Sequence, residues 1–94
     1  MIVSFRNRGS EDIFNGLDTK AARRTCPQSA WPAAQRRLDA VNFARELMDL
    51  RHLGLEKLKG NREGQHSIRV NDQYRVCFVW HVHDAELVEV VDYH

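Results

Sequence analysis

The chain has 94 residues, enough for one small domain with a single modest core. Hydrophobic residues make up 43% of it and charged residues 29%, a balance typical of a folded protein that excludes a disordered chain. No apolar run approaches the ~20 residues that a membrane-spanning helix needs, and a formal net charge of +1 does not by itself identify a partner.

Targeting and redox features of the sequence favour the cytoplasm. The N-terminus has a short apolar start but no signal-peptide core or cleavage site. Cys26 and Cys77 lie in segments of different character and form no Cys-x-x-Cys motif. We therefore expect a cytoplasmic protein with both thiols reduced.

The first third of the chain predicts a strand, a short helix and a loop. Residues 2–5 alternate between apolar and polar side chains, which indicates a strand. Ser10, with two acids directly after it, is a candidate N-cap for a brief helix that Gly16 would end. Residues 18–30 are mostly polar and contain a proline, which favours a loop.

The main helix is predicted to begin near Trp31. Pro32 suits the first turn and Ser29 is a candidate cap before it. An apolar residue recurs every three or four positions, the pattern of one buried helix face. The residues of this face are Ala34, Leu38, Val41, Ala44 (or Arg45), Leu47 and Met48. We expect the helix to run to about Arg51, before Gly54.

Three strands are predicted in the last third, at residues 66–71, 74–81 and 86–93. Short polar turns separate them, so they should form an antiparallel meander. The expected fold class is therefore α+β, with an N-terminal strand, two helices and a three-strand meander in one domain over residues 1–94.

Two arginines of the meander are predicted to lie opposite one another. Side chains alternate across a strand, so Arg69 and Arg75 lie on the face opposite the apolar one. A three-residue turn at 71–73 would pair them, and opposed like charges cost stability. An anion bound beside them would explain the pair; two side chains that extend into water are the alternative.

The second turn, at 83–85, sets the register of the last strand. A three-residue turn there would pair Trp80 with Val88, Phe78 with Val90 and Arg75 with Tyr93. Only shifts by an even number of residues would keep the apolar face intact.

Charge is unevenly distributed along the chain. Between Arg51 and Arg75 there are six lysines and arginines against three acids, whereas residues 84–92 hold four acids and neither lysine nor arginine. The basic segment suits an anionic partner, although a solvated loop would show the same charges. His81 and His83 have no third ligand at fitting spacing, so we predict no metal site and no cofactor.

Several motifs together resemble a known family. Two segments carry the resemblance: Leu-Lys-Gly-Asn-Arg-Glu-Gly-Gln-His-Ser-Ile-Arg-Val-Asn-Asp-Gln-Tyr-Arg-Val-Cys-Phe (58–78) and the terminal Val-Asp-Tyr-His (91–94). Together they look like the motifs of a HigB-type toxin of the RelE/ParE superfamily. The opening Met-Ile-x-Ser-Phe and Glu-Leu-x-Asp-Leu-Arg (46–51) also fit, so the resemblance covers nearly the whole chain.

The resemblance implies a RelE-like compact fold and an endoribonuclease that cuts messenger RNA in the ribosomal A site. It also implies a HigA-like helix-turn-helix antitoxin that neutralises the toxin and represses the shared operon, so that operator DNA is reached only through the antitoxin. A rival within the superfamily is a ParE-like protein that inhibits DNA gyrase by binding it, without cutting RNA.

One position departs from the family pattern. Some HigB relatives carry a histidine shortly before the Leu-x-Gly turn, where this chain has Glu56 and Lys57. Any role of that histidine would have to be supplied by Lys57 or His94.

Metal-independent RNA cleavage requires a base for the 2′-OH, an acid for the departing 5′-oxygen and cations at the phosphorane. Because an imidazole ordinarily titrates near neutral pH, His94 is the first candidate for acid or base. Tyr93 could stack on a base, orient the substrate or donate a proton, and Asp92 could orient either neighbour or be purely structural. Arg75 is the candidate phosphate stabiliser, because its planar guanidinium matches phosphate oxygens.

The remaining candidates bind RNA. Lys59, Arg62 and Arg69 are expected to contact backbone phosphates, and His66 could assist them or be an ordinary polar residue at a strand end.

Overall fold

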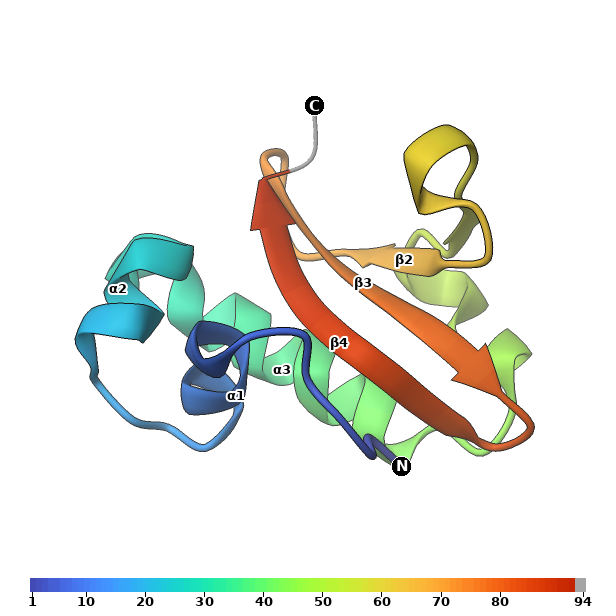
Figure 1. Ribbon diagram of the computed structural model, residues 1–94, viewed down its shortest axis with the longest axis horizontal. Helices are drawn as coiled ribbons and strands as arrows, with labels where there is room; N and C mark the ends of the chain where they lie inside the picture. Colours follow the sequence, from blue (N-terminus) through green and yellow to red (C-terminus); the bar gives the residue numbers. More distant parts are fainter. Residues whose placement is uncertain (93–94) are drawn as a thin grey trace.

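The computed structural model describes residues 1–92, in which helices cover one face of a four-stranded antiparallel sheet (Figure 1). The helical elements are α1 (Arg8–Phe14), α2 (Lys20–Thr25), the 3₁₀ helix η1 (Gln28–Ala30), α3 (Trp31–Phe43), and the 3₁₀ helices η2 (Leu47–Leu53) and η3 (Gly60–Arg62). The strands are β1 (Glu56–Lys57), β2 (His66–Arg69), β3 (Tyr74–His81) and β4 (Asp84–Asp92), in that order across the sheet. The predicted α+β class and antiparallel meander are confirmed, and β1 extends the meander by a fourth strand.

The N-terminal segment runs beside β4 without forming the predicted strand (Figure 1). Ile2 and Phe5 make isolated parallel bridges to Ala85 and Val88. Between these bridges the Ser4 hydroxyl accepts a hydrogen bond from the N–H of Leu87, whose φ of +51° interrupts regular pairing. The segment thus covers the outer edge of β4, but a regular N-terminal strand is not confirmed.

The cap of the first helix is Asn7, not Ser10. The Asn7 side chain accepts from the Ser10 N–H at 2.9 Å, so α1 begins earlier than predicted. Ser10 is instead fully buried, and its hydroxyl accepts a hydrogen bond from the Val90 N–H of β4. Gly16 does follow the helix end, with a φ of +73° that suits glycine.

The predicted loop at 18–30 is wrong, because it contains α2. Thr19 caps this helix by accepting from the Ala22 N–H, and its hydroxyl donates to Asp12 at 2.6 Å. These short-range contacts give a six-residue helix whose buried side chain, Ala22, packs in the core.

The start of α3 agrees with the prediction, but its cap and its end do not. Ala30 of η1, rather than Ser29, precedes Trp31 and makes no side-chain cap. The helix ends at Phe43, because Ala44 turns into extended backbone. The predicted continuation to Arg51 is a 3₁₀ helix, and Met48 is 59% exposed instead of buried.

A reciprocal cap explains the break after α3. The Asp49 carboxylate accepts the backbone N–H groups of Arg45 and Glu46 at 3.1 and 3.0 Å. These donors lower the pKa of Asp49. They start a new helical turn in a new direction and thereby end the α3 axis.

The register between β2 and β3 is as predicted, with Arg69 opposite Arg75 and Ile68 opposite Val76. The predicted register of β4 is wrong: Trp80 pairs with Ala85 rather than Val88, and Arg75 pairs with Val91 rather than Tyr93.

Two features cause the shift in β4. The β3–β4 turn is tighter than expected and places Val82 at a φ of +58°, and an irregularity follows between Cys77 and Val79. The bulge realigns the strands, so that Val90 lies opposite Val76 instead of the predicted Phe78.

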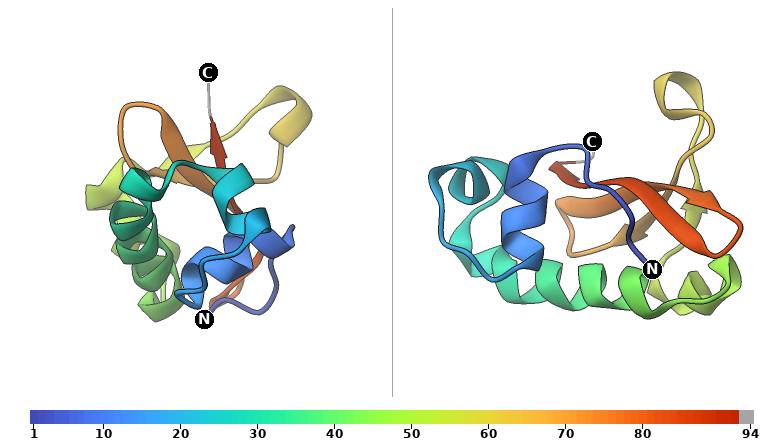
Figure 2. Two further views of the ribbon diagram at one scale, coloured as in Figure 1. Left: turned by 90° about the vertical axis from the view of Figure 1, so that its left-hand side faces the viewer. Right: turned by 60° about the horizontal axis from the view of Figure 1, so that its bottom comes forward.

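Figure 2 shows the helices packed along one face of the sheet, and the buried apolar residues come from both layers. Ile68, Val76 and Phe78 of the sheet are fully buried, as are Leu38 and Val41 of α3. The predicted helix-covered face of the sheet is therefore confirmed. No helix within residues 1–92 is both long enough and apolar enough to cross a membrane.

Candidate functional site

Arg75 is held rigidly on the sheet face that the long helix does not cover. Its side chain is only 14% exposed. The Nε atom donates to the Ser67 hydroxyl at 2.8 Å, and one terminal nitrogen donates to the Gly54 carbonyl at 2.5 Å. The Glu56 carboxylate lies 3.9 Å from the same terminal nitrogen. These acceptors fix both the position and the plane of the guanidinium.

The backbone around Gly54 is built to present that carbonyl. Gly54 ends η2 with a φ of +71°, a conformation that favours glycine. A Cβ added there would lie 3.4 Å from the Cβ of Arg69 and 3.8 Å from the Arg75 guanidinium. Gly54 and the buried Ser67 were not identified from the sequence, although the glycine was correctly placed beyond a helix.

Arg69, the cross-strand partner of Arg75, points toward different acceptors. Its guanidinium pairs with Asp72 and donates to the Asn71 carbonyl at 3.3 Å. Because each arginine has its own protein acceptors, the repulsion expected between opposed like charges is offset within the sheet. A bound anion is therefore not needed for the fold to tolerate the pair.

A second group of charges lies on the same face, next to Arg75. Arg62 donates to the Glu89 carboxylate at 2.8 Å and to the Gln65 side chain at 3.1 Å. Arg6 approaches the same Glu89 oxygen at 3.4 Å, and Glu89 itself is almost fully buried. Together with Asn61 they line an open pocket of about 440 Å³. Arg6 and Glu89 were missed, although an acid within the apolar run of β4 was a signal for Glu89.

Lys57 and His66 form a cross-strand pair that the register places on the opposite face from Arg75. The His66 ring stacks on Phe78 with centroids 6.4 Å apart. Burial, followed by the charge of Lys57, lowers the pKa of His66. Its Nδ1 has no hydrogen-bond partner within residues 1–92. The structure thus brings Lys57 and His66 together, but not with Arg75; Lys57 lies on the edge strand, at the rim of the sheet.

Of the three C-terminal candidates, only Asp92 lies within the described residues. Asp92 is the last described residue, lies opposite Tyr74 and accepts a hydrogen bond from the Gln73 side chain at 3.0 Å. Desolvation, together with the charge of Asp92, raises the pKa of Tyr74. Tyr93 and His94 lie outside the described residues. Lys59 is exposed just before η3.

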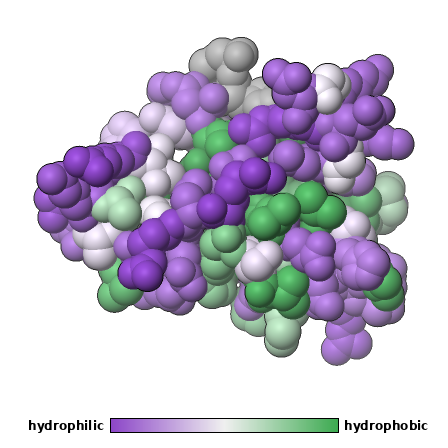
Figure 3. Space-filling model, viewed as in Figure 1, coloured by the Kyte–Doolittle hydropathy of each residue, from purple (hydrophilic) through white to green (hydrophobic). Residues whose placement is uncertain are grey.

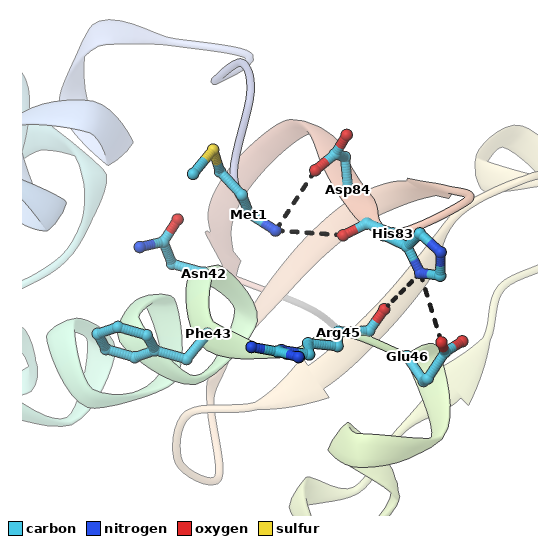
Figure 4. A pocket seen from close by; sticks show the side chains of 8 residues that line it. Met1, Asn42, Phe43, Arg45, Glu46, His83 and Asp84 are labelled. Atoms are coloured by element: carbon cyan, nitrogen blue, oxygen red, sulfur yellow. Dashed lines mark hydrogen bonds and ion pairs between the residues drawn. The ribbon is translucent and has the colours of Figure 1, made fainter.

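A second pocket, larger than the one at Glu89, lies at the other end of the molecule and contains none of the predicted site residues (Figure 4). It has a volume of about 600 Å³ and lies where the N-terminus meets the end of α3 and the β3–β4 turn. The His83 Nδ1 donates to the Arg45 carbonyl at 2.9 Å and lies 3.4 Å from the Glu46 carboxylate, and the terminal amine lies 3.5 Å from Asp84. These contacts join turns at the surface, and the charged groups that make them, at Met1, Glu46 and Asp84, are all accessible to solvent.

The two ends also differ in surface character. On the face drawn in Figure 3, hydrophilic side chains cover the end that carries residues 57–65, whereas hydrophobic side chains gather toward the N-terminus. Met1, Val3 and Leu87 are exposed hydrophobic residues of that N-terminal end. Within residues 1–92 no three His, Cys, Asp or Glu side chains group as metal ligands would.

Comparison with known proteins gives consistent matches. The family model described as RelE-like toxin of type II toxin-antitoxin system HigB matches residues 3–94. A protein named Endoribonuclease HigB, from Proteus vulgaris, is 32% identical over 96 residues. The alignment covers 100% of this chain and 100% of that protein. A protein named Toxin HigB-1, from Vibrio cholerae serotype O1, is 36% identical over 83 residues, which cover 85% of this chain and 84% of that protein.

Proposed function

Because the chain belongs to the HigB family of RelE-like toxins of type II toxin–antitoxin systems, we propose that it is an endoribonuclease that cleaves messenger RNA on the ribosome and so inhibits translation. The name of the Proteus vulgaris relative supports the activity. The observation on this chain that carries the proposal is the fixed guanidinium of Arg75, held by Ser67 and Gly54 on the open face of the sheet.

Cleavage proceeds by attack of a 2′-OH on the adjacent phosphate, which places extra negative charge on the phosphorane. Arg75 stabilises that charge, because a positioned cation in a partly desolvated site needs no reorganisation as the charge develops. Its low exposure and fixed acceptors support this role.

Proton transfer belongs to the C-terminal residues in this proposal. His94 takes the proton of the 2′-OH or protonates the 5′-oxygen, since imidazole titrates near neutral pH. Tyr93 stacks on a base or donates a proton, and Asp92 orients one of the two. Lys57 is the other candidate for proton transfer. It ranks after His94, because it lies on the edge strand of the sheet and not on the face that carries Arg75.

The ribosome and the RNA backbone are contacted by the exposed cations around this face. Lys59 and Arg69 contact backbone phosphates, as does Arg62 beside Glu89. His66 is less suited to a direct RNA contact, because its ring stacks on Phe78.

A toxin of this family has a cognate antitoxin. We propose that the antitoxin is a HigA-like helix-turn-helix protein, that it carries the contact to operator DNA, and that the toxin acts in the cytoplasm, where ribosomes and messenger RNA are found.

Primer extension on messenger RNA after brief induction tests the activity. Cuts in phase with codons support the ribosome-dependent nuclease. Intact messenger RNA together with DNA breaks would instead support the ParE-like gyrase inhibitor. A parallel incubation with naked messenger RNA separates ribosome-dependent from free cleavage, because positioning on the ribosome supplies orientation that lowers the barrier. Efficient cutting of naked RNA at nanomolar protein would contradict the ribosome dependence.

A further inference from the structure

The pocket beside Arg75 is a strong candidate for a second binding site. Arg6, Asn61, Arg62, Gln65 and Glu89 line about 440 Å³ of open space, within the usual range of sites for small ligands. Its lining is polar and carries two arginines against one glutamate, so it suits an anion with hydrogen-bonding groups.

Glu89 is the buried carboxylate with which both arginines of the pocket pair. It is 6% exposed, and a carboxylate so deeply buried is stable only when it is paired. One of its oxygens is approached by Arg62 at 2.8 Å and by Arg6 at 3.4 Å, from two segments far apart in the sequence. The shared carboxylate therefore holds the two guanidinium groups side by side at the pocket, with a net charge of +1.

The pocket continues the face that carries Arg75. Glu89 lies directly opposite Cys77, and Cys77 follows Arg75 by two residues on the same face of β3. Glu89 is therefore displaced from Arg75 by two residues along the strand, roughly 7 Å, and by one strand across the sheet, about 5 Å, which leaves room for about one nucleotide between Arg75 and the pocket.

We propose that this pocket binds the nucleotide that flanks the scissile phosphate, an inference that rests on the proposed function. Arg6 and Arg62 contact the phosphate of that nucleotide. The side-chain amides of Asn61 and Gln65 meet the polar edge of its base, because unstacked RNA bases are read through hydrogen bonds to their edges. Arg6, which lies far from the C-terminal residues in sequence, becomes an RNA-binding residue.

Single-turnover cleavage on messenger RNA-programmed ribosomes tests the proposal, with the protein concentration varied. Arg6→Ala is compared with Arg8→Ala, a matched control in the same segment, where the side chain is 76% exposed and its ion pair is with Glu11. Arg6→Ala is expected to raise the half-saturating concentration about tenfold, the scale of one charged hydrogen bond, with little change in the rate at saturation. Arg8→Ala should behave as the parent.

Asn61→Ala keeps the test independent of folding, because Asn61 is exposed and takes no part in the Glu89 ion pairs. Mapped cut sites of Asn61→Ala should show a weaker preference at the nucleotide next to the cut. The proposal is overturned if both variants match Arg8→Ala, or if Arg6→Ala lowers only the rate at saturation. A parent protein that cuts nothing would refute the proposed function itself, whereas a parent that cuts normally beside unaffected variants refutes only the flanking subsite.

Discussion

The Arg75 face and the N-terminal pocket hold their polar groups in opposite ways. At the pocket, the Met1 amine, the backbone carbonyl of Arg45, the His83 ring and the Asp84 carboxylate make polar contacts between exposed turns. On the sheet face, arginines are held by buried groups that come from distant segments. Under the proposed function, the comparison teaches that pre-positioned charge is a better guide to the catalytic site than cavity volume, because catalysis uses groups that need no reordering.

The sharpest test of this comparison removes one arginine from each region. Arg75→Ala should lower the rate of messenger RNA cleavage on ribosomes by about 10²–10³-fold, the usual effect of losing a positioned transition-state donor. Arg45→Ala, at the pocket, should leave it unchanged. Cleavage rates are measured together with circular dichroism of both purified variants. Full activity in a folded Arg75→Ala protein would remove the catalytic assignment.

The same approach extends to the C-terminal residue. His94→Ala should relieve growth arrest as Arg75→Ala does, because proton transfer commonly contributes 10²–10⁴-fold to the rate. Growth after induction is the measurement, with soluble expression checked by immunoblot. Unabated toxicity of soluble His94→Ala would assign proton transfer elsewhere, with Lys57 the next residue to replace.

Salt dependence separates binding cations from the catalytic one. Replacement of Lys57 and Lys59 by glutamine should flatten the slope of log affinity for 70S ribosomes against log salt by up to about two units, since each phosphate contact releases a counterion. With His94 as the residue that transfers the proton, the rate of cleavage by the bound toxin should not fall in proportion; a matching fall in the Lys57 single variant would instead assign proton transfer to Lys57. Because Lys57 and Lys59 are replaced separately as well as together, the series also shows whether the rim position of Lys57 faces the ribosome. An unchanged slope would move the contact to Lys20, Arg23 and Arg24 or to the exposed face of the long helix.

A smaller effect is expected from the acceptor that positions Arg75. Ser67→Ala removes the hydroxyl that receives the Arg75 Nε hydrogen, so the guanidinium loses orientation while its charge remains. The cleavage rate should fall about tenfold, in line with a hydrogen bond to a charged group. The matched control is Ser4→Ala, whose hydroxyl accepts the Leu87 N–H at the opposite end. Ser67→Thr keeps a hydroxyl, so a folded Ser67→Thr protein should recover part of the cleavage rate. Equal cleavage rates for Ser67→Ala and Ser4→Ala would show that Ser67 does not position Arg75 for cleavage.

The smallest effect concerns pH. Because the pKa of His66 is lowered in the folded protein by burial and then by Lys57, the unfolded chain binds the proton more readily. Folding stability should therefore fall as the pH drops below the ordinary histidine value of about 6.5, and be regained above it. The free energy of unfolding, measured by urea denaturation between pH 5 and 8, should vary less with pH in His66→Gln than in the parent.

Local sequence signals predicted the elements whose causes are local. The alternation over Tyr74–His81 gave β3 at its observed bounds, and Pro32 located the start of α3. The three-residue turn placed Arg69 opposite Arg75. Fold class and family were likewise accessible, because the motifs at 58–78 are contiguous.

Only the tertiary structure decided which charges meet. The end of α3 depends on the Asp49 carboxylate, which caps the next helical turn. The register of β4 depends on a bulge in its pairing with β3. The periodicity of apolar residues reveals neither feature. The acceptors of Arg75 come from Gly54 and Ser67, and those of Arg62 include Glu89, 27 residues away in the chain. The sequence by itself determined the types of residue available for RNA chemistry. Their pairing required the folded sheet, since burial forces each charge to find a partner wherever the chain places one.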